Sequence, residues 1–122
     1  MTQRSKESVP PTPLSPATFH ILLALAGEDV HGYAILKEVE RRTGRKVALS
    51  TGTLYGILKR LLADGLILEL RSRRAGPDDD ARRRYYRLTP RGREIAAAEA
   101  ERLGRLVEVA RARRLLGRLR PA

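Results

Sequence analysis

The segment from residue 50 to residue 70, STGTLYGILKRLLADGLILEL, constrains the fold more than any other part of the chain. Its apolar residues recur at intervals of three and four positions, which is typical of a helix with one buried face. These residues are Leu54, Ile57, Leu58, Leu61 and Leu62. Asp64-Gly65 then interrupts the pattern, and an apolar run follows directly. The segment therefore predicts a helix over 51–64 that turns at once into a strand.

A second strand pattern follows at residues 82–92, RRRYYRLTPRG. We expect strands over 66–71 and 83–88, because the residues between them carry Gly, Pro and Asp, which favour a turn. Side chains alternate across a strand, so Tyr86 and Leu88 should point inward when Arg87 faces water. Helix, strand, basic turn and strand in this order are the pattern of a winged helix-turn-helix.

Two further helices are predicted upstream. The first, over 15–27, has a capping Ser15 and a Pro16 suited to the first helical position, and it is apolar over much of its surface. The second, over 32–43, begins at His31-Gly32-Tyr33, and Ser50 is expected to cap the third. The predicted fold class is mainly α with a small β-hairpin, forming a winged helix-turn-helix domain over residues 14–89.

The two ends of the chain differ from this domain. Residues 1–13 are polar and rich in proline, which predicts a disordered N-terminal arm. Residues 90–122 predict a C-terminal dimerisation helix and a basic tail, with Thr89-Pro90 at the helix start and helical character to about Leu119. An apolar stripe on this helix needs a partner. The expected dimer-interface residues are Phe19, Ile21, Leu22, Leu25, Leu103, Leu106, Val107 and Ala110.

The charge of the chain favours a nucleic-acid partner. Among 122 residues, 25 are basic and 14 are acidic, which gives a net charge of +11. The alternative is a solvated surface that is merely rich in arginine. It accounts for the use of Arg in place of Lys, but it does not account for the excess of positive charge. The absence of cysteine excludes disulfides and Cys-type zinc sites. No apolar run is long enough to span a bilayer, so we expect no membrane association and a cytoplasmic location.

The third helix carries the first group of candidate DNA-binding residues. Backbone N–H groups at its start attract a phosphate, and its cations reach phosphates or guanine edges. The candidates are Ser50, Thr51, Gly52, Thr53, Tyr55, Lys59 and Arg60. An ordinary capped surface helix is the alternative interpretation. The hairpin that follows makes it less favoured.

The hairpin carries the second group. A basic hairpin beside a recognition helix usually follows the flanking DNA backbone or minor groove. The candidates here are Arg73, Arg74, Arg82, Arg83 and Arg84. The alternative is a charged edge that prevents strand addition. Asp78–Asp80 at the tip either point away from DNA or pair with nearby arginines. A metal site is less favoured, because consecutive aspartates in a turn rarely converge on one ion.

No arrangement of residues suggests catalysis. His20 and His31 are the only histidines, and neither has a second ligand at metal-binding spacing or a nucleophile to serve. We expect His20 in the core or an interface, and His31 as a cap or packing residue at the start of the second helix. We therefore expect no cofactor and no resident metal, and an enzyme is the least favoured class.

Two segments carry a family resemblance. HGYAILKEVERRTGRKVALSTGTLYGILKRLLADGLI, followed by RRRYYRLTPRGRE, resembles the PadR family of bacterial transcriptional regulators over about residues 14–95. Thr51 and Gly56 depart from it, since prolines are frequent there. The resemblance implies a repressor that binds a pseudo-palindromic promoter site as a homodimer through one C-terminal helix. In some members a small aromatic or drug-like effector at the dimer interface releases the DNA.

The function predicted from the sequence is thus a sequence-specific DNA-binding regulator, acting as a repressor. Its expected partners are double-stranded DNA and a second copy of the chain. The aromatic content, with no Trp and one Phe beside four Tyr, gives little support to an aromatic effector. Two alternatives stay open, a non-specific nucleic-acid-binding or architectural protein and a winged-helix protein-interaction module.

Overall fold

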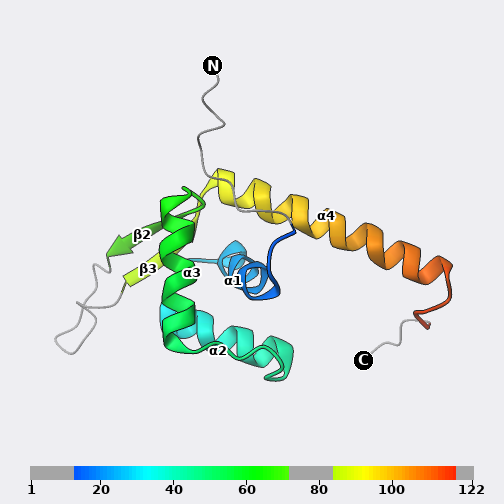
Figure 1. Ribbon diagram of the computed structural model, residues 1–122. Helices are drawn as coiled ribbons and strands as arrows, with labels where there is room; N and C mark the ends of the chain where they lie inside the picture. Colours follow the sequence, from blue (N-terminus) through cyan, green and yellow to red (C-terminus); the bar gives the residue numbers. More distant parts are fainter. Residues whose placement is uncertain (1–12, 72–83, 118–122) are drawn as a thin grey trace, which may run out of the picture.

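The computed structural model describes residues 13–71 and 84–117. In that part the chain forms four helices and three strands (Figure 1). The helices are α1 (Pro16–Gly27), α2 (Gly32–Thr43), α3 (Thr51–Ala63) and α4 (Pro90–Ala112), and the strands are β1 (Val30–His31), β2 (Ile67–Arg71) and β3 (Arg84–Leu88). The predicted fold class, mainly α with a small β-hairpin, is confirmed. Residues 1–12 of the predicted arm and the acidic tip Asp78–Asp80 lie outside the described residues.

The sheet has one strand more than the predicted hairpin. Its order is β1-β3-β2, and both pairings are antiparallel. Val30 pairs with Tyr86 in one ladder, and Ile67 pairs with Leu88 in the other. Strand β1 was missed because two residues are too few to show an alternating pattern.

Side-chain caps fix the start of each of the four helices in the described residues. The hydroxyl oxygens of Ser15, Ser50 and Thr89 accept hydrogen bonds from backbone N–H groups three residues later, at 3.0–3.1 Å. Nδ1 of His31 accepts from the N–H of Ala34 at 3.2 Å and caps α2 in the same way. All four caps are where the sequence predicted a helix start, because these side chains satisfy N–H groups that lack a partner in the helix.

The core lies where α1, α2 and α3 meet the sheet. Ile21, Leu22 and Ile35 are fully buried there. Tyr86 and Leu88 point into the same core from β3, as predicted, while Arg87 between them is exposed. One side of α3 is therefore held firmly, and its other side is presented to solvent.

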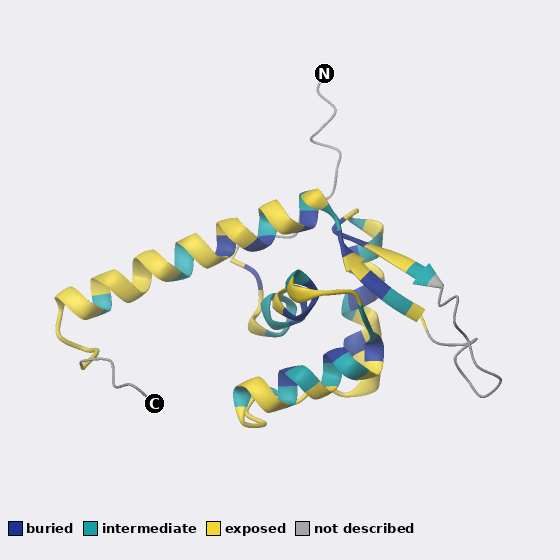
Figure 2. Cartoon of the chain, turned by 180° about the vertical axis from the view of Figure 1, so that it is seen from behind, coloured by how far each residue is buried: buried dark blue, intermediate teal, exposed yellow. Residues whose placement is uncertain are grey.

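Helix α4 leaves this body and projects from it (Figures 1 and 2). Its first half packs through Gly92, Ala96 and Glu99, which are buried, whereas most of its second half is exposed. The helix ends at Ala112 rather than near Leu119, so the predicted length was wrong. The reason lies in the backbone, because Arg114 adopts a positive φ of 60° that no right-handed helix can continue through.

Candidate nucleic-acid interface

The exposed side of α3 forms a shallow, basic face. Leu54, Leu58 and Leu61 are buried and fix the helix against the core. The residues on the other side are all exposed, and they include every α3 candidate named from the sequence. They are Thr51, Gly52, Thr53, Tyr55, Gly56, Lys59, Arg60 and Ala63, together with the capping Ser50. Because three of them are Gly or Ala, little side-chain bulk separates the helix backbone from an approaching molecule.

The first turn of α3 favours an anion. The Ser50 hydroxyl accepts from the N–H of Thr53 and donates to its side-chain oxygen at 3.0 Å. The N–H groups of Thr51 and Gly52, at the first two helical positions, have no acceptor within the helix. No acidic residue lies in this turn, so the positive end of the helix dipole is not neutralised.

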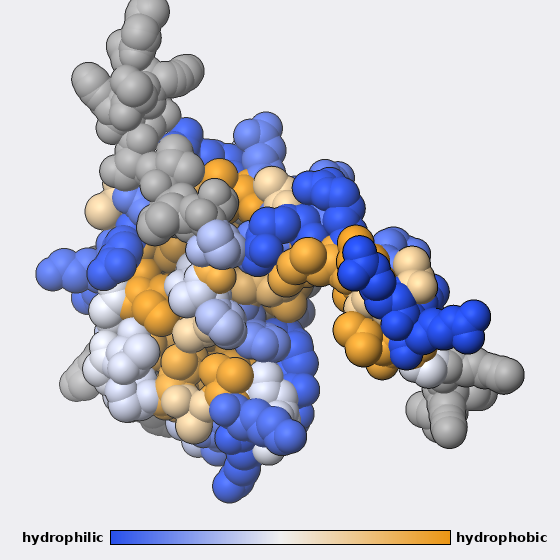
Figure 3. Space-filling view, turned by 45° about the vertical axis from the view of Figure 1, so that its right-hand side comes forward, coloured by the Kyte–Doolittle hydropathy of each residue, from blue (hydrophilic) through white to orange (hydrophobic). Residues whose placement is uncertain are grey.

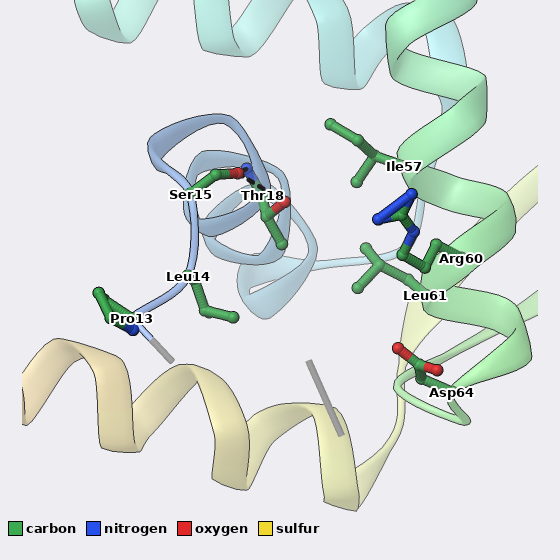
Figure 4. A pocket seen from close by; sticks show the side chains of 8 residues that line it. All are labelled: Pro13, Leu14, Ser15, Thr18, Ile57, Arg60, Leu61 and Asp64. Carbon is green, nitrogen blue, oxygen red and sulfur yellow. Dashed lines mark hydrogen bonds between the residues drawn. The ribbon is translucent and has the colours of Figure 1, made fainter. Parts of the chain in front are cut away.

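The two cations of α3 have different surroundings. Lys59 and Arg60 are both exposed, and neither makes a hydrogen bond or an ion pair within the described part of the chain. Arg60, however, lies at the edge of the face, where its side chain lines a pocket of about 280 Å³ between α3 and the start of α1 (Figure 4). Lys59 is absent from that pocket lining and is the cation of the open face.

The pocket beside Arg60 mixes apolar and charged groups. Leu14, Ile57 and Leu61 provide most of its apolar lining, and Asp64 provides a carboxylate one turn beyond Arg60 (Figure 4). Its other lining residues are Pro13, Ser15 and Thr18. Arg60 thus borders this pocket one helical turn from a carboxylate, whereas Lys59 lies on the open face.

Tyr55 lies at the other edge of the face, against the start of α2. A Cβ atom on Gly32 would overlap the Tyr55 hydroxyl and lie 2.8 Å from Cζ of the ring. The ring is still 45% exposed. Sequence reasoning treated Tyr55 as a DNA contact alone and missed this packing, because nothing in the spacing of residues 32 and 55 indicates that they meet.

Only the base of the predicted wing is described. Arg84 donates to Glu69 across the β2–β3 ladder at 2.8 Å, and its side chain is 61% exposed. Arg73, Arg74, Arg82 and Arg83 lie outside the described residues. Arg84 is therefore the one wing candidate with a known position, at the end of β3 that leads toward the tip.

A second ion pair holds the sheet to the loop before β1. Arg87 donates to both carboxylate oxygens of Asp29, at 3.1 and 2.9 Å. This hydrogen bonding lowers the pKa of the Asp29 carboxyl below its ordinary value. Arg87 is thus engaged within the protomer, so it is less available to a phosphate than an unpaired cation.

The two histidines lie at helix contacts. His31 is both the cap of α2 and an edge-to-face neighbour of Tyr85, with ring centroids 5.4 Å apart, as a capping or packing role predicted. His20 is partly buried between α1 and α2. Its Nδ1 is 3.4 Å from Nη1 of Arg42, which also donates to the His20 carbonyl. Burial and, to a lesser degree, the Arg42 charge lower the pKa of His20.

The expected dimer-interface residues fall into two sets. Three of them, Ile21, Leu22 and Leu25, are buried in the protomer's own core. They have no exposed surface that a partner could contact, so we remove them from the candidate interface. The sequence could not separate them, because α1 is apolar on all sides. Leu106 and Val107 are exposed, while Phe19, Leu103 and Ala110 are partly buried. Leu23, which is 36% exposed and one turn after Phe19, was not among the residues named from the sequence.

In the described part of the chain no helix is long and apolar enough to cross a membrane. Figure 3 shows apolar surface on the projecting part of α4 and on the domain body, on either side of a notch. The surface of the protomer thus combines a basic helix face with an apolar region beside α4.

Comparison with known proteins places these features in a family. The model of the PadR-like transcriptional regulator family matches residues 21–98. The transcriptional regulator Rv3488 of Mycobacterium tuberculosis is 44% identical over 92 residues, which are 75% of this chain and 77% of that protein. A PadR family regulator from Clostridium difficile has a similar solved structure, with a TM-score of 0.68 and 28% identity, over 80% of this chain and 97% of the other.

A third relative is much longer. An uncharacterized 37.1 kDa protein in a transposon of Streptomyces fradiae is 40% identical over 86 residues, which are 70% of this chain but 22% of that protein. This chain therefore spans only about a fifth of the length of that protein. Since the family model covers more than half of the residues and the winged-helix face is present, the chain belongs to the PadR-like family of transcriptional regulators.

Proposed function

We propose that the protein is a homodimeric repressor that binds a pseudo-palindromic promoter site through α3 and the wing. The observation that carries this proposal is the exposed face of α3, where Gly52, Gly56 and Ala63 accompany Lys59, which has no ion-pair partner in the part of the chain that the structure describes. Small residues allow the backbone to approach a groove closely, and a free ammonium group binds a phosphate or a guanine edge. No acidic residue in the first turn opposes this contact.

The contacts divide by position along the interface. Ser50, Thr51 and Thr53 at the start of α3 suit a phosphate, because the helix N-terminus is there. Lys59 suits the groove, and Arg84 suits the flanking backbone at the base of the wing. Arg60 belongs to the edge of this surface. The further wing arginines named from the sequence, Arg73, Arg74, Arg82 and Arg83, stay part of the proposal.

The proposed dimer rests on the apolar stripe of α4. Leu106 and Val107 are 53% and 42% exposed, and Leu103 and Ala110 lie partly buried on the same side. An apolar helix face of this length is stabilised when a second apolar surface covers it. A second copy of the chain supplies such a surface through its own α4 and the exposed Leu23 of α1. Two-fold symmetry then presents two α3 helices to two half-sites.

The last part of the proposal is a small-molecule effector. The family resemblance implies that such an effector binds at the dimer interface. The apolar side chains of Phe19, Leu23 and Leu106 border that region in the protomer. A ligand there would be largely apolar. It would act by changing how the two subunits pack, rather than by covering α3.

Fluorescence-anisotropy binding tests the DNA-binding proposal. The probe is a duplex from upstream of the protein's own gene, compared with a scrambled duplex across a salt series. We expect the first duplex to bind roughly a thousandfold more tightly at physiological salt. Lys59→Gln should weaken that binding, while Lys46→Gln, in the loop before α3, is the matched control.

The open alternatives give different results in the same experiment. Equal and steeply salt-dependent binding to both duplexes would indicate a non-specific nucleic-acid-binding protein. Binding no stronger than that of a simple polycation would indicate a protein-interaction module. Unchanged affinity of Lys59→Gln for the operator would remove α3 from the interface.

A further inference from the structure

The pocket between α3 and the start of α1 carries two groups of opposite charge. Arg60 and Asp64 both line it, and both side chains extend from α3 toward α1 (Figure 4). Neither makes a hydrogen bond or an ion pair within residues 13–71 and 84–117. Their order along the helix accounts for this, because a cation four residues before an acid pairs less well than the reverse. A guanidinium and a carboxylate therefore face the same cavity, and each is available to a ligand.

The floor of the pocket is apolar. Leu14 and Leu61 are buried there, at 7% and 2% exposed, and Ile57 packs against the same core. A ligand with an apolar part is stabilised when it covers these side chains. The volume of about 280 Å³ lies just below the range of roughly 300–1,000 Å³ that holds drug-sized molecules. The pocket is therefore suited to a small metabolite with an apolar side.

The wall on the α1 side favours a carboxylate. The Thr18 hydroxyl accepts from Ser15 at 2.9 Å, which leaves its own proton for another acceptor. Helix α1 begins at this wall, and its first turn has no acidic residue that would neutralise the positive end of the helix dipole. Arg60 lies across the pocket from Thr18 (Figure 4). A ligand carboxylate between the two sides would meet a guanidinium and a hydroxyl.

We infer that this pocket binds a free α-amino acid with an aliphatic side chain about the size of leucine. The α-carboxylate pairs with Arg60, the α-ammonium group pairs with Asp64, and the side chain covers Leu14 and Leu61. Residues one helical turn apart have Cβ atoms about 5–6 Å from each other, a separation that a zwitterion with both charges on one carbon bridges. This site lies within one protomer, and it differs from the effector site proposed at the dimer interface.

Arg60 connects the pocket with the DNA-binding face. It lies at the edge of the exposed α3 surface as well as in the pocket lining. A bound carboxylate holds the guanidinium toward α1 and neutralises it, so it is no longer available to a phosphate. This consequence rests on the proposed function, whereas binding of the amino acid does not. Because linkage is reciprocal, the amino acid and DNA should lower each other's affinity by the same factor.

Four probes separate the three parts of the site. L-leucine carries both charges and the aliphatic chain, N-acetyl-L-leucine lacks the ammonium group, L-leucinamide lacks the carboxylate, and glycine lacks the side chain. Each is titrated into the full-length protein without DNA, and the amide signals are followed by NMR. Leucine should shift the signals of Leu14, Thr18, Ile57 and Leu61. Each of the other three probes should bind about tenfold more weakly, because each loses one of the contacts.

Two substitutions assign the charged contacts. Arg60→Gln should weaken leucine by about tenfold and make leucine and leucinamide bind alike, because the partner of the carboxylate is gone. Asp64→Asn should do the same for leucine and N-acetyl-leucine. Lys59→Gln is the matched control, since it removes a charge from the neighbouring residue, which does not line the pocket. It should leave the affinity for leucine unchanged. Thermal unfolding checks that each variant is folded.

Fluorescence anisotropy measures the link to DNA. Saturating leucine should raise the Kd of the upstream duplex by about fivefold, whereas glycine at the same concentration should not. The Kd of Arg60→Gln for the same duplex should be insensitive to leucine.

The possible results distinguish the site from its link to DNA. If leucine shifts none of the pocket signals up to the limit of its solubility, or if all four probes bind alike, the site is overturned. Leucine binding that leaves the affinity for the upstream duplex unchanged would overturn the link and keep the site. If leucine binds as expected while the upstream duplex binds no better than the scrambled one, the proposed function fails and the site stands.

Discussion

At the scale of single residues, two glycines of α4 have opposite surroundings. Gly92 faces Leu66, just before β2, and the end of β3, where a Cβ would overlap the Leu66 carbonyl oxygen and lie 2.9 Å from Cδ1 of Leu88. Gly104 has nothing within 4 Å of the same position. Gly92 is therefore required by close packing of α4 on the sheet, whereas Gly104 is a helix residue of low intrinsic propensity.

The first prediction concerns these glycines. Gly92→Ala should lower the free energy of unfolding by about 2 kcal/mol, because backbone must shift to admit the methyl group. Gly104→Ala should raise it by roughly 0.5–1 kcal/mol, because alanine favours the helix and meets no obstacle. Urea denaturation followed by circular dichroism measures both. Equal effects of the two substitutions would contradict the packing of α4 described here.

A buried carboxylate ties the N-terminal end of the domain to α4. Glu99 is 3% exposed and accepts from Nε and Nη2 of Arg102, at 3.1 and 2.7 Å. Hydrogen bonding from Arg102 holds the pKa of Glu99 below its ordinary value, and the backbone N–H of Leu14 adds to this effect. The ionised form is therefore the one that the folded protein stabilises.

The second prediction follows from the sign of this shift. With a lowered pKa in the folded state, the contribution of Glu99 is complete above the ordinary glutamate pKa of about 4.3, and it is lost as pH falls through the folded value. Glu99→Gln should lower the free energy of unfolding at neutral pH and flatten its dependence on pH below 5. Glu101→Gln, at an exposed position of α4, is the control. An unchanged pH profile for Glu99→Gln would show that the carboxylate is not linked to folding.

The sequence allowed some of these residues to be placed and not others. Ser15, Ser50 and Thr89 were assigned correctly because a cap is a local signal, formed by a side chain and a backbone N–H three residues away. Gly92 and Glu99 gave no such signal. Their roles depend on which part of the sheet and of the N-terminal segment lies against α4, and that is decided by tertiary packing.

At the scale of elements, α4 is anchored in its first half and free in its second. The stripe of Leu103, Leu106, Val107 and Ala110 was predictable from its spacing, and the partner that it needs stays a prediction. The end of the helix at Ala112 was not, because it depends on the backbone of Arg114. Strand β1 was missed for a similar reason, since its pairing with β3 is non-local.

The third prediction tests α4 as the dimerisation element. Leu106→Glu should weaken self-association by roughly a hundredfold or more, because it places an unpaired charge in an apolar interface. Leu115→Glu is the matched control. Leu115 is 78% exposed and lies beyond the end of α4. Sedimentation equilibrium measures both variants. A Leu106→Glu protein that remains dimeric would show that another surface joins the subunits.

At the scale of the whole molecule, some charged residues form ion pairs within the protomer and others are left for binding a partner. Several acidic residues of the described part are paired within the protomer, as in Glu69–Arg84, Asp29–Arg87 and Glu99–Arg102. Other cations, such as Lys59, have no ion-pair partner among residues 13–71 and 84–117, and they contribute to the net charge of +11. In a two-fold dimer these cations occur twice, once for each half-site.

The fourth prediction follows from that symmetry. Inserting about five base pairs between the two half-sites of the operator rotates one of them to the opposite side of the DNA, so affinity should fall close to that of a single half-site. Inserting about ten base pairs returns both half-sites to one side and should restore part of the affinity. Gel-shift titration of the three duplexes measures this. Affinity that is independent of the spacing would mean that the subunits bind separately.

The short strand β1 has a consequence for the thermodynamics of binding. β3 pairs with β1 on one side and with β2 on the other, so a single strand connects the start of α2 to the base of the wing. The elements on both sides of α3 are then held at a fixed separation before DNA arrives. Little conformational entropy is lost on ordering them, which makes association fast and leaves more of the contact energy to appear as affinity. In the proposed DNA complex, the two residues of β1 would thus lower the entropic cost of binding.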